Sequence, residues 1–110
     1  MKKPSLLYIF TDQQRADTLS CYGNDYIEMP ALNRLAEQSH VFENAYVSQP
    51  VCSPSRATML CGLYPHTARV PACNVPLPEE VKTIAEMVDP DCRRHYLGKW
   101  HLGDEIFAQH

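Results

Sequence analysis

The chain has 110 residues, 45% of them hydrophobic, and its formal charge at pH 7 is −3. A chain of this length and composition builds at most one small domain, and its weak negative charge excludes the basic surface that nucleic-acid binding needs. No apolar stretch reaches the length of a membrane span, so we expect neither a nucleic-acid partner nor a membrane partner.

The predicted elements alternate between strands and helices along the chain. A short apolar run predicts a buried strand at 6–10, and Pro30 opens a helical stretch that places Leu32 and Leu35 on one face. Prolines crowd residues 64–78, which predicts an irregular surface loop. The other expected elements are strands at 41–47 and 94–97, a helix at 54–61 that ends at Gly62, and a helix at 79–88. This alternation indicates an α/β layered domain with a mainly parallel sheet.

The cellular compartment is predicted from the first apolar run and from the cysteines. The run at 6–10 is too short for the apolar region of a secretory signal, and no small-residue cleavage site follows it. The cysteines are odd in number and form no Cys-x-x-Cys pair, which favours reduced thiols. We therefore expect a cytoplasmic rather than a periplasmic protein. The five cysteines are Cys21, Cys52, Cys61, Cys73 and Cys92.

Three residues whose side chains are suited to metal binding or catalysis follow the predicted strands. Asp12 comes after the first strand, Lys99 follows the last, and Cys52 lies five residues after the second. In parallel sheets, ligands bind beyond the carboxyl ends of the strands. We therefore expect these three pieces of chain to converge on one edge of the sheet.

A cysteine, a proline and an arginine are closely spaced at residues 52–56. Ser53 is a suitable cap, and Pro54 is suited to the first helical position. The N–H groups and positive dipole at such a helix start cradle an anion, and Arg56 adds a charged fork suited to sulfate or phosphate oxygens. Two alternatives for Cys52 are an inert buried cysteine and a phosphatase-type thiolate loop. The second needs a longer spacing than the three residues found here between cysteine and arginine.

The pattern Cys52-x-Pro54-Ser55-Arg56 resembles the signature of the type I, formylglycine-dependent sulfatases. A second family motif is closely matched by the six residues Gly98-Lys99-Trp100-His101-Leu102-Gly103. The resemblance implies that residues 1–110 are the N-terminal part of a single sulfatase catalytic domain, with an alkaline-phosphatase-like fold that is incomplete here. It also implies that a maturation enzyme oxidises Cys52 to formylglycine, whose hydrate attacks the sulfur of a small-molecule or glycan sulfate ester.

The resemblance assigns roles to the second motif as well. Lys99 would hold a sulfate oxygen through the transition state, and His101 would exchange a proton near neutral pH. In an extended segment, residues two apart project to the same side, so both would face the site while Trp100 packs away. The alternatives are a solvated lysine beside a core histidine, and a zinc module built from Cys92, His95 and His101. The spacing of the last three matches no familiar zinc pattern.

Asp12-Gln13 occupies the position of the acidic pair that binds a divalent cation in sulfatases. The resemblance implies calcium, with magnesium or manganese as alternatives, held by Asp12, Gln13 and the converted Cys52. Gln13 departs from the Asp-Asp pattern, and this Asp-Gln version resembles hydrolases of choline sulfate and of phosphonate monoesters.

Three functions therefore stay open at this point. They are a sulfatase, a phosphonate or phosphate ester hydrolase of the same superfamily, and a non-catalytic truncated remnant. We expect the 110 residues alone to bind metal weakly and to be inactive.

Overall fold

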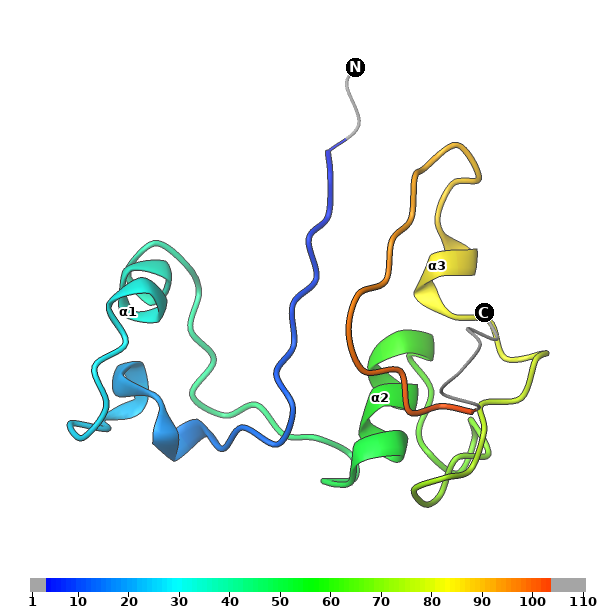
Figure 1. Ribbon diagram of the computed structural model, residues 1–110, viewed down its shortest axis with the longest axis horizontal. Coiled ribbons are helices and arrows are strands. Elements are labelled where there is room, and N and C mark those ends of the chain that lie inside the picture. Colours follow the sequence, from blue (N-terminus) through cyan, green and yellow to red (C-terminus); the bar gives the residue numbers. More distant parts are fainter. Residues whose placement is uncertain (1–3, 104–110) are drawn as a thin grey trace. The chain divides into compact units, whose positions relative to one another are not determined.

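The computed structural model describes residues 4–103 and divides the chain into two units, Met1–Ala45 and Tyr46–His110 (Figure 1). Among the described residues, no helix is long and apolar enough to cross a membrane. The elements in chain order are the 3-10 turns η1 (Ala16–Thr18) and η2 (Ser20–Tyr22) and the helices α1 (Pro30–Glu37), α2 (Cys52–Cys61) and α3 (Ile84–Met87).

The first unit is held by local hydrogen bonds, since none of residues 4–45 is buried. The Tyr22 hydroxyl donates to the carbonyl of Phe42 at 2.8 Å, which joins η2 to the chain that follows α1. Helix α1 begins at Pro30 as predicted, because proline fits a first helical turn that needs no N–H partner. The apolar face of this helix is not buried, since Leu32 is 44% exposed and Leu35 is 59% exposed.

The three predicted strands, and the parallel sheet they would form, do not occur among residues 4–103. Figure 1 draws the first of them as an extended trace, and its side chains Leu6 and Leu7 are 77% and 82% exposed. The physical reason is that a strand is defined by hydrogen bonds to a neighbouring strand, and the described residues pair no such neighbour with 6–10, 41–47 or 94–97. Apolar composition alone does not supply that partner.

The hydrophobic core lies in the second unit and is built around α2. Ala57 and Leu60 on this helix pack with residues that come from the proline-rich stretch and from the last described segment. The Leu77 N–H donates to the Leu102 carbonyl at 2.9 Å, which holds those two segments together. The predicted surface loop at 64–78 is indeed irregular, but it is also part of the core. The remaining core members are Cys61, Ala68, Val70, Leu77 and Leu102.

Helix α2 ends as predicted and begins two residues earlier than predicted. Its end is Gly62, whose φ of 74° is a left-handed conformation that costs glycine nothing. Its first residue is Cys52, and Val51 is the cap position. The expected roles of Ser53 as cap and Pro54 as first helical residue are therefore wrong. The Ser55 N–H already donates to the Val51 carbonyl at 3.0 Å, which places Pro54 inside the first turn.

Helix α3 is shorter than the helix predicted at 79–88. Thr83 precedes it, and the Thr83 N–H donates to the Glu86 carboxylate at 2.8 Å. This reciprocal arrangement of a threonine and a glutamate three residues later fixes the start of a helix. The chain before Thr83 instead forms a turn in which the Val81 N–H donates to the Pro78 carbonyl.

Candidate active site

The start of α2 influences a cysteine that comes from another part of the second unit. This residue is Cys73, which lies in the loop between Pro71 and Leu77. Pro54 has no N–H, so Cys52 and Ser53 are the only residues of the first three in α2 that can donate from the backbone here. An anion cradle at this helix start stays a prediction, with Cys52 and Ser53 as its backbone donors.

The start of α2 changes the chemistry of Cys73. Hydrogen bonding by the Ser53 backbone acts most strongly to lower the pKa of the Cys73 thiol, and desolvation acts in the opposite direction. N–H donors at a helix start stabilise a thiolate in this way. The Ser53 side chain is 0% exposed, and its buried hydroxyl has no hydrogen-bond partner.

Arg56 ties the two sequence motifs of the second unit together. Its Nη1 donates to the Lys99 carbonyl at 2.7 Å, and the residue is only 5% exposed. The last described segment accordingly runs past α2 in Figure 1. A guanidinium carries five N–H donors, so this bond uses a part of its capacity. The structure thus brings Arg56 on α2 against the backbone of Lys99, and the predicted convergence of Asp12, Cys52 and Lys99 on a sheet edge stays a prediction.

His101 departs from the extended geometry expected of its segment. Its φ is 57°, which interrupts the simple alternation that would place Lys99 and His101 on one side. Trp100 does pack against the core, as predicted. The His101 Nε2 lies 3.2 Å from the Asn74 Oδ1, and the buried Nδ1 has no hydrogen-bond partner. An amide oxygen only accepts, so in the tautomer with its proton on Nε2 the ring donates to Asn74.

Asp12 and Gln13 lie in the first unit, both exposed, and Gln13 has a left-handed φ of 53°. Their oxygens are the hard donors that calcium and magnesium prefer, so the donor chemistry fits the implied metal. Across residues 4–103, however, no three His, Cys, Asp or Glu side chains gather closely enough to hold a metal ion. Asp12 and Gln13 would supply only part of a coordination shell, and among the described residues the zinc module of Cys92, His95 and His101 finds no support.

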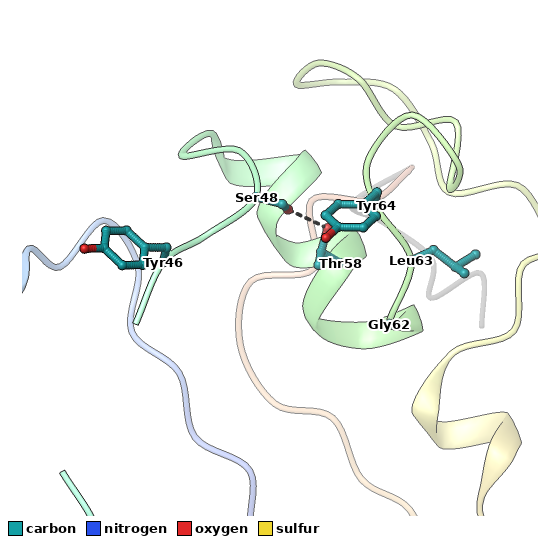
Figure 2. Close-up of a pocket in the computed structure, with 6 residues that line it drawn as sticks. All are labelled: Tyr46, Ser48, Thr58, Gly62, Leu63 and Tyr64. Carbon is teal, nitrogen blue, oxygen red and sulfur yellow. Dashed lines mark hydrogen bonds between the residues drawn. The ribbon is translucent and has the colours of Figure 1, made fainter. Parts of the chain in front are cut away.

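An open pocket lies beside the other half of α2 and does not contain the predicted site residues. Figure 2 shows its lining, in which the Ser48 and Thr58 hydroxyls are 3.2 Å apart. Tyr64, which lines the same pocket, stacks on His66 with ring centroids 5.8 Å apart. The pocket is lined by Tyr46, Ser48, Thr58, Gly62, Leu63 and Tyr64.

Sequence reasoning missed the contribution of Cys73 and Asn74 to this site. Both lie in a turn, and Asn74 has a left-handed φ of 62° that asparagine tolerates better than most residues. An asparagine after a cysteine in a proline-rich stretch signals a turn. Nothing local signals that this turn folds back onto His101.

Comparison with known proteins identifies the family. A family model described as Sulfatase matches residues 4–104 of this chain. The chain is 39% identical over 101 residues to an ulvan-active sulfatase of Formosa agariphila, covering 91% of this chain and 20% of that protein. It is 36% identical over 113 residues to human arylsulfatase A, covering 93% of this chain and 22% of the human protein. It is 35% identical over 108 residues to an N-acetylgalactosamine-6-O-sulfatase of Bacteroides thetaiotaomicron, covering 93% and 21%.

The chain spans about a fifth of the length of these curated relatives. No solved structure gives a significant match.

Proposed function

This chain belongs to the sulfatase family, and on that premise we propose that it hydrolyses sulfate monoesters, as the N-terminal part of an alkaline-phosphatase-like catalytic domain. The observation that carries the proposal is the start of α2. Cys52 is the first residue of this helix, and Arg56 on the same helix donates to the Lys99 carbonyl. Donors arranged in this way suit an anionic group that must be held still while it reacts.

We assign Cys52 as the precursor of the nucleophile. A maturation enzyme would convert it to formylglycine, whose hydrate supplies a hydroxyl for attack on the sulfur of the ester. Cys52 is half-buried at the first position of α2, so a group formed there lies beside the helix dipole and its N–H donors.

Arg56, Lys99 and His101 complete the proposed catalytic set. Arg56 and Lys99 would stabilise the negative charge that develops on sulfate oxygens, because both carry positive charge and the Lys99 backbone contacts Arg56. His101 would accept or return a proton at Nδ1, the ring nitrogen that does not contact Asn74.

A divalent metal, calcium first and magnesium or manganese as alternatives, would be held partly by Asp12, Gln13 and the converted Cys52. Such an ion polarises sulfate oxygens and lowers the pKa of a bound hydroxyl. Gln13 supplies a neutral oxygen where the family has a second carboxylate, so we expect weaker binding than at an Asp-Asp pair.

The substrate class follows from the relatives. Several of them are named for sulfated glycans or sugars, such as the ulvan-active and N-acetylgalactosamine-6-O-sulfatases. We therefore propose a sulfated glycan or a smaller sulfate ester as the substrate, and a cytoplasmic setting for its turnover.

The deciding experiment is mass spectrometry of the peptide that contains Cys52, from protein isolated from its native host. We expect the mass of the aldehyde form at Cys52, and the unmodified thiol at Cys92, which is a matched internal control because it is exposed and lies outside the motif. An intact thiol at Cys52 in all molecules would reject the mechanism.

A second candidate function, phosphonate or phosphate ester hydrolysis, is favoured by Gln13 alone. Parallel turnover of an aryl sulfate and an aryl phosphonate by the native-host protein separates the two. If the aryl phosphonate is turned over faster than the aryl sulfate, phosphonate esters replace sulfate esters as the proposed substrate. The isolated 110 residues are expected to turn over neither ester, because they span about a fifth of the length of the relatives.

A further inference from the structure

The His101 ring is in contact with a residue from a different segment of the second unit. Its Nε2 lies 3.2 Å from the Oδ1 of Asn74, which belongs to the loop between Pro71 and Leu77. The other ring nitrogen, Nδ1, is buried and has no hydrogen-bond partner among residues 4–103. The two nitrogens of this ring therefore have different surroundings, since one contacts a side-chain amide and the other does not.

Packing next to this contact holds the two segments in register. Three residues after Asn74, the Leu77 N–H donates to the carbonyl of Leu102, the residue that follows His101, at 2.9 Å. The two leucine side chains belong to the core and are 2% and 0% exposed. A backbone hydrogen bond between two buried residues resists sliding of one segment past the other, because sliding would leave buried polar groups unpaired. The position of the amide beside the ring is thus set by contacts outside the pair.

Both partners also have a left-handed backbone conformation. The φ angle is 62° at Asn74 and 57° at His101. Asparagine and histidine adopt this conformation more often than most residues do, but it remains unfavourable for any residue with a Cβ. Residues held in such conformations cluster at functional sites, where the surrounding structure maintains them. Two of them in direct contact indicate a constraint on the position of the ring.

We propose that Asn74 is a positioning residue for His101. Its Oδ1 accepts a hydrogen bond from Nε2–H, which leaves Nδ1 without a proton and able to accept one. The proposal rests on the proposed function, in which His101 exchanges a proton during ester hydrolysis. An amide suits this role because its oxygen orients the ring and carries no charge, whereas a carboxylate would also favour the imidazolium form. Asn74 itself exchanges no proton and acts through His101.

The first test is the protonation state of the His101 ring nitrogens. Protein from the native host, labelled with ¹⁵N in its histidine rings, is studied by long-range ¹H–¹⁵N NMR at a pH where the ring is neutral. The His101 signals are assigned by their absence from His101→Gln. We expect a proton on Nε2 and none on Nδ1. A proton on Nδ1 would overturn the proposal, because the Asn74 amide would then have to donate through Nδ2.

Two variants of Asn74 test the same hydrogen bond by changing one property at a time. Asn74→Asp keeps the size of the side chain and an acceptor oxygen, so the proton should stay on Nε2. Asn74→Gly accepts the left-handed φ without strain and removes the acceptor, so exchange of Nε2–H with water should become faster. A change of tautomer in the aspartate variant, or unchanged exchange in the glycine variant, would contradict the proposal.

The kinetic test compares Asn74→Gly with Gln49→Ala, a matched control in the same loop. The Gln49 side-chain amide donates to the Pro71 carbonyl at 2.8 Å, so this variant loosens the loop and leaves Asn74 in place. With an aryl sulfate as substrate, Asn74→Gly should lower kcat about 10-fold at unchanged KM, a part of the roughly 10²–10⁴-fold that a positioned acid–base group contributes.

Gln49→Ala should leave kcat unchanged. Equal losses of kcat in the two variants would mean that Asn74 serves only the structure of the loop, and would overturn the proposal. The NMR readouts need no turnover. If the wild type hydrolyses no sulfate ester, the proposed function fails while the protonation state of His101 still decides the role of Asn74.

Discussion

The bond between Arg56 and the Lys99 carbonyl gives a direct test of how the second unit is held together. Arg56→Met keeps an apolar stem of similar length and removes the donor, so the carbonyl loses a charged partner in a place where Arg56 was 5% exposed. We expect the free energy of unfolding to fall by about 2 kcal/mol, the range for a hydrogen bond to a charged group. That is a change of roughly 30-fold in the folded-to-unfolded ratio.

The matched control is Arg94→Met. Arg94 makes the same type of bond, from Nη1 to the Ala85 carbonyl, at the same 2.7 Å, but in an exposed position. Its removal should cost at most about 0.5 kcal/mol, because water replaces the lost donor. The two variants differ in burial, with bond type and length held constant.

The assay is urea unfolding followed by fluorescence of Trp100, which is the single tryptophan of the chain and follows Lys99 directly. Trp100 packs against the core and makes an edge contact with Tyr96 at 5.3 Å, so its emission reports separation of this segment from α2. With a slope of about 1 kcal/mol per molar urea, the Arg56→Met midpoint should fall by about 2 M. Equal midpoints for the Arg56 and Arg94 variants would refute the argument that burial sets the value of this bond.

Three other predictions follow from the same unit. Gly62→Ala should destabilise the chain by about 1 kcal/mol in urea unfolding, because a Cβ at this position meets nothing within 4 Å and only the φ of 74° is strained; a stability equal to that of the wild type would contradict this. Leu102→Ala, at a side chain that is 0% exposed, should cost about 2–5 kcal/mol and lower the thermal midpoint, whereas a change below about 1 kcal/mol would mean that the core is not packed as described. The pKa of Glu80 is lowered, by hydrogen bonds first from its own backbone and then from Arg69, so its small contribution is present above the unfolded-state pKa and is lost as pH falls through the folded-state pKa. Unfolding of the wild type and Glu80→Gln should therefore differ slightly at neutral pH and coincide in acid, and a difference that grows in acid would reverse the sign of this argument.

What the sequence predicted well depends on neighbours in the chain. Pro30 and Gly62 mark a helix start and a helix end through properties of single residues, and both marks hold. The start of α2 was predicted two residues too late because Ser53 and Pro54 are also compatible with positions inside the first helical turn. The hydrogen bond from the Ser55 N–H to the Val51 carbonyl selects the earlier start.

What the sequence could not predict depends on distant partners. The apolar run at 6–10 has the composition of a strand, but composition does not provide a hydrogen-bonded neighbour, and the structure assigns no strand to these residues. The lowered pKa of the Cys73 thiol depends on how a proline-rich loop packs its buried residues against α2. We expected the two family motifs to meet at the edge of a parallel sheet. In the second unit the Arg56 side chain instead joins them directly through its bond to the Lys99 carbonyl.

Because Pro54 has no N–H, the backbone at the start of α2 can supply only some of the hydrogen bonds that an oxyanion needs. Most helices offer an additional backbone donor in their first turn, and here that donor is absent by covalent structure. A tetrahedral ligand has more oxygen atoms than this truncated set of amides can reach. The main-chain N–H groups would therefore orient the ligand, and long cationic side chains would neutralise its charge. The affinity for the ligand would then depend on the contacts that hold those side chains in position.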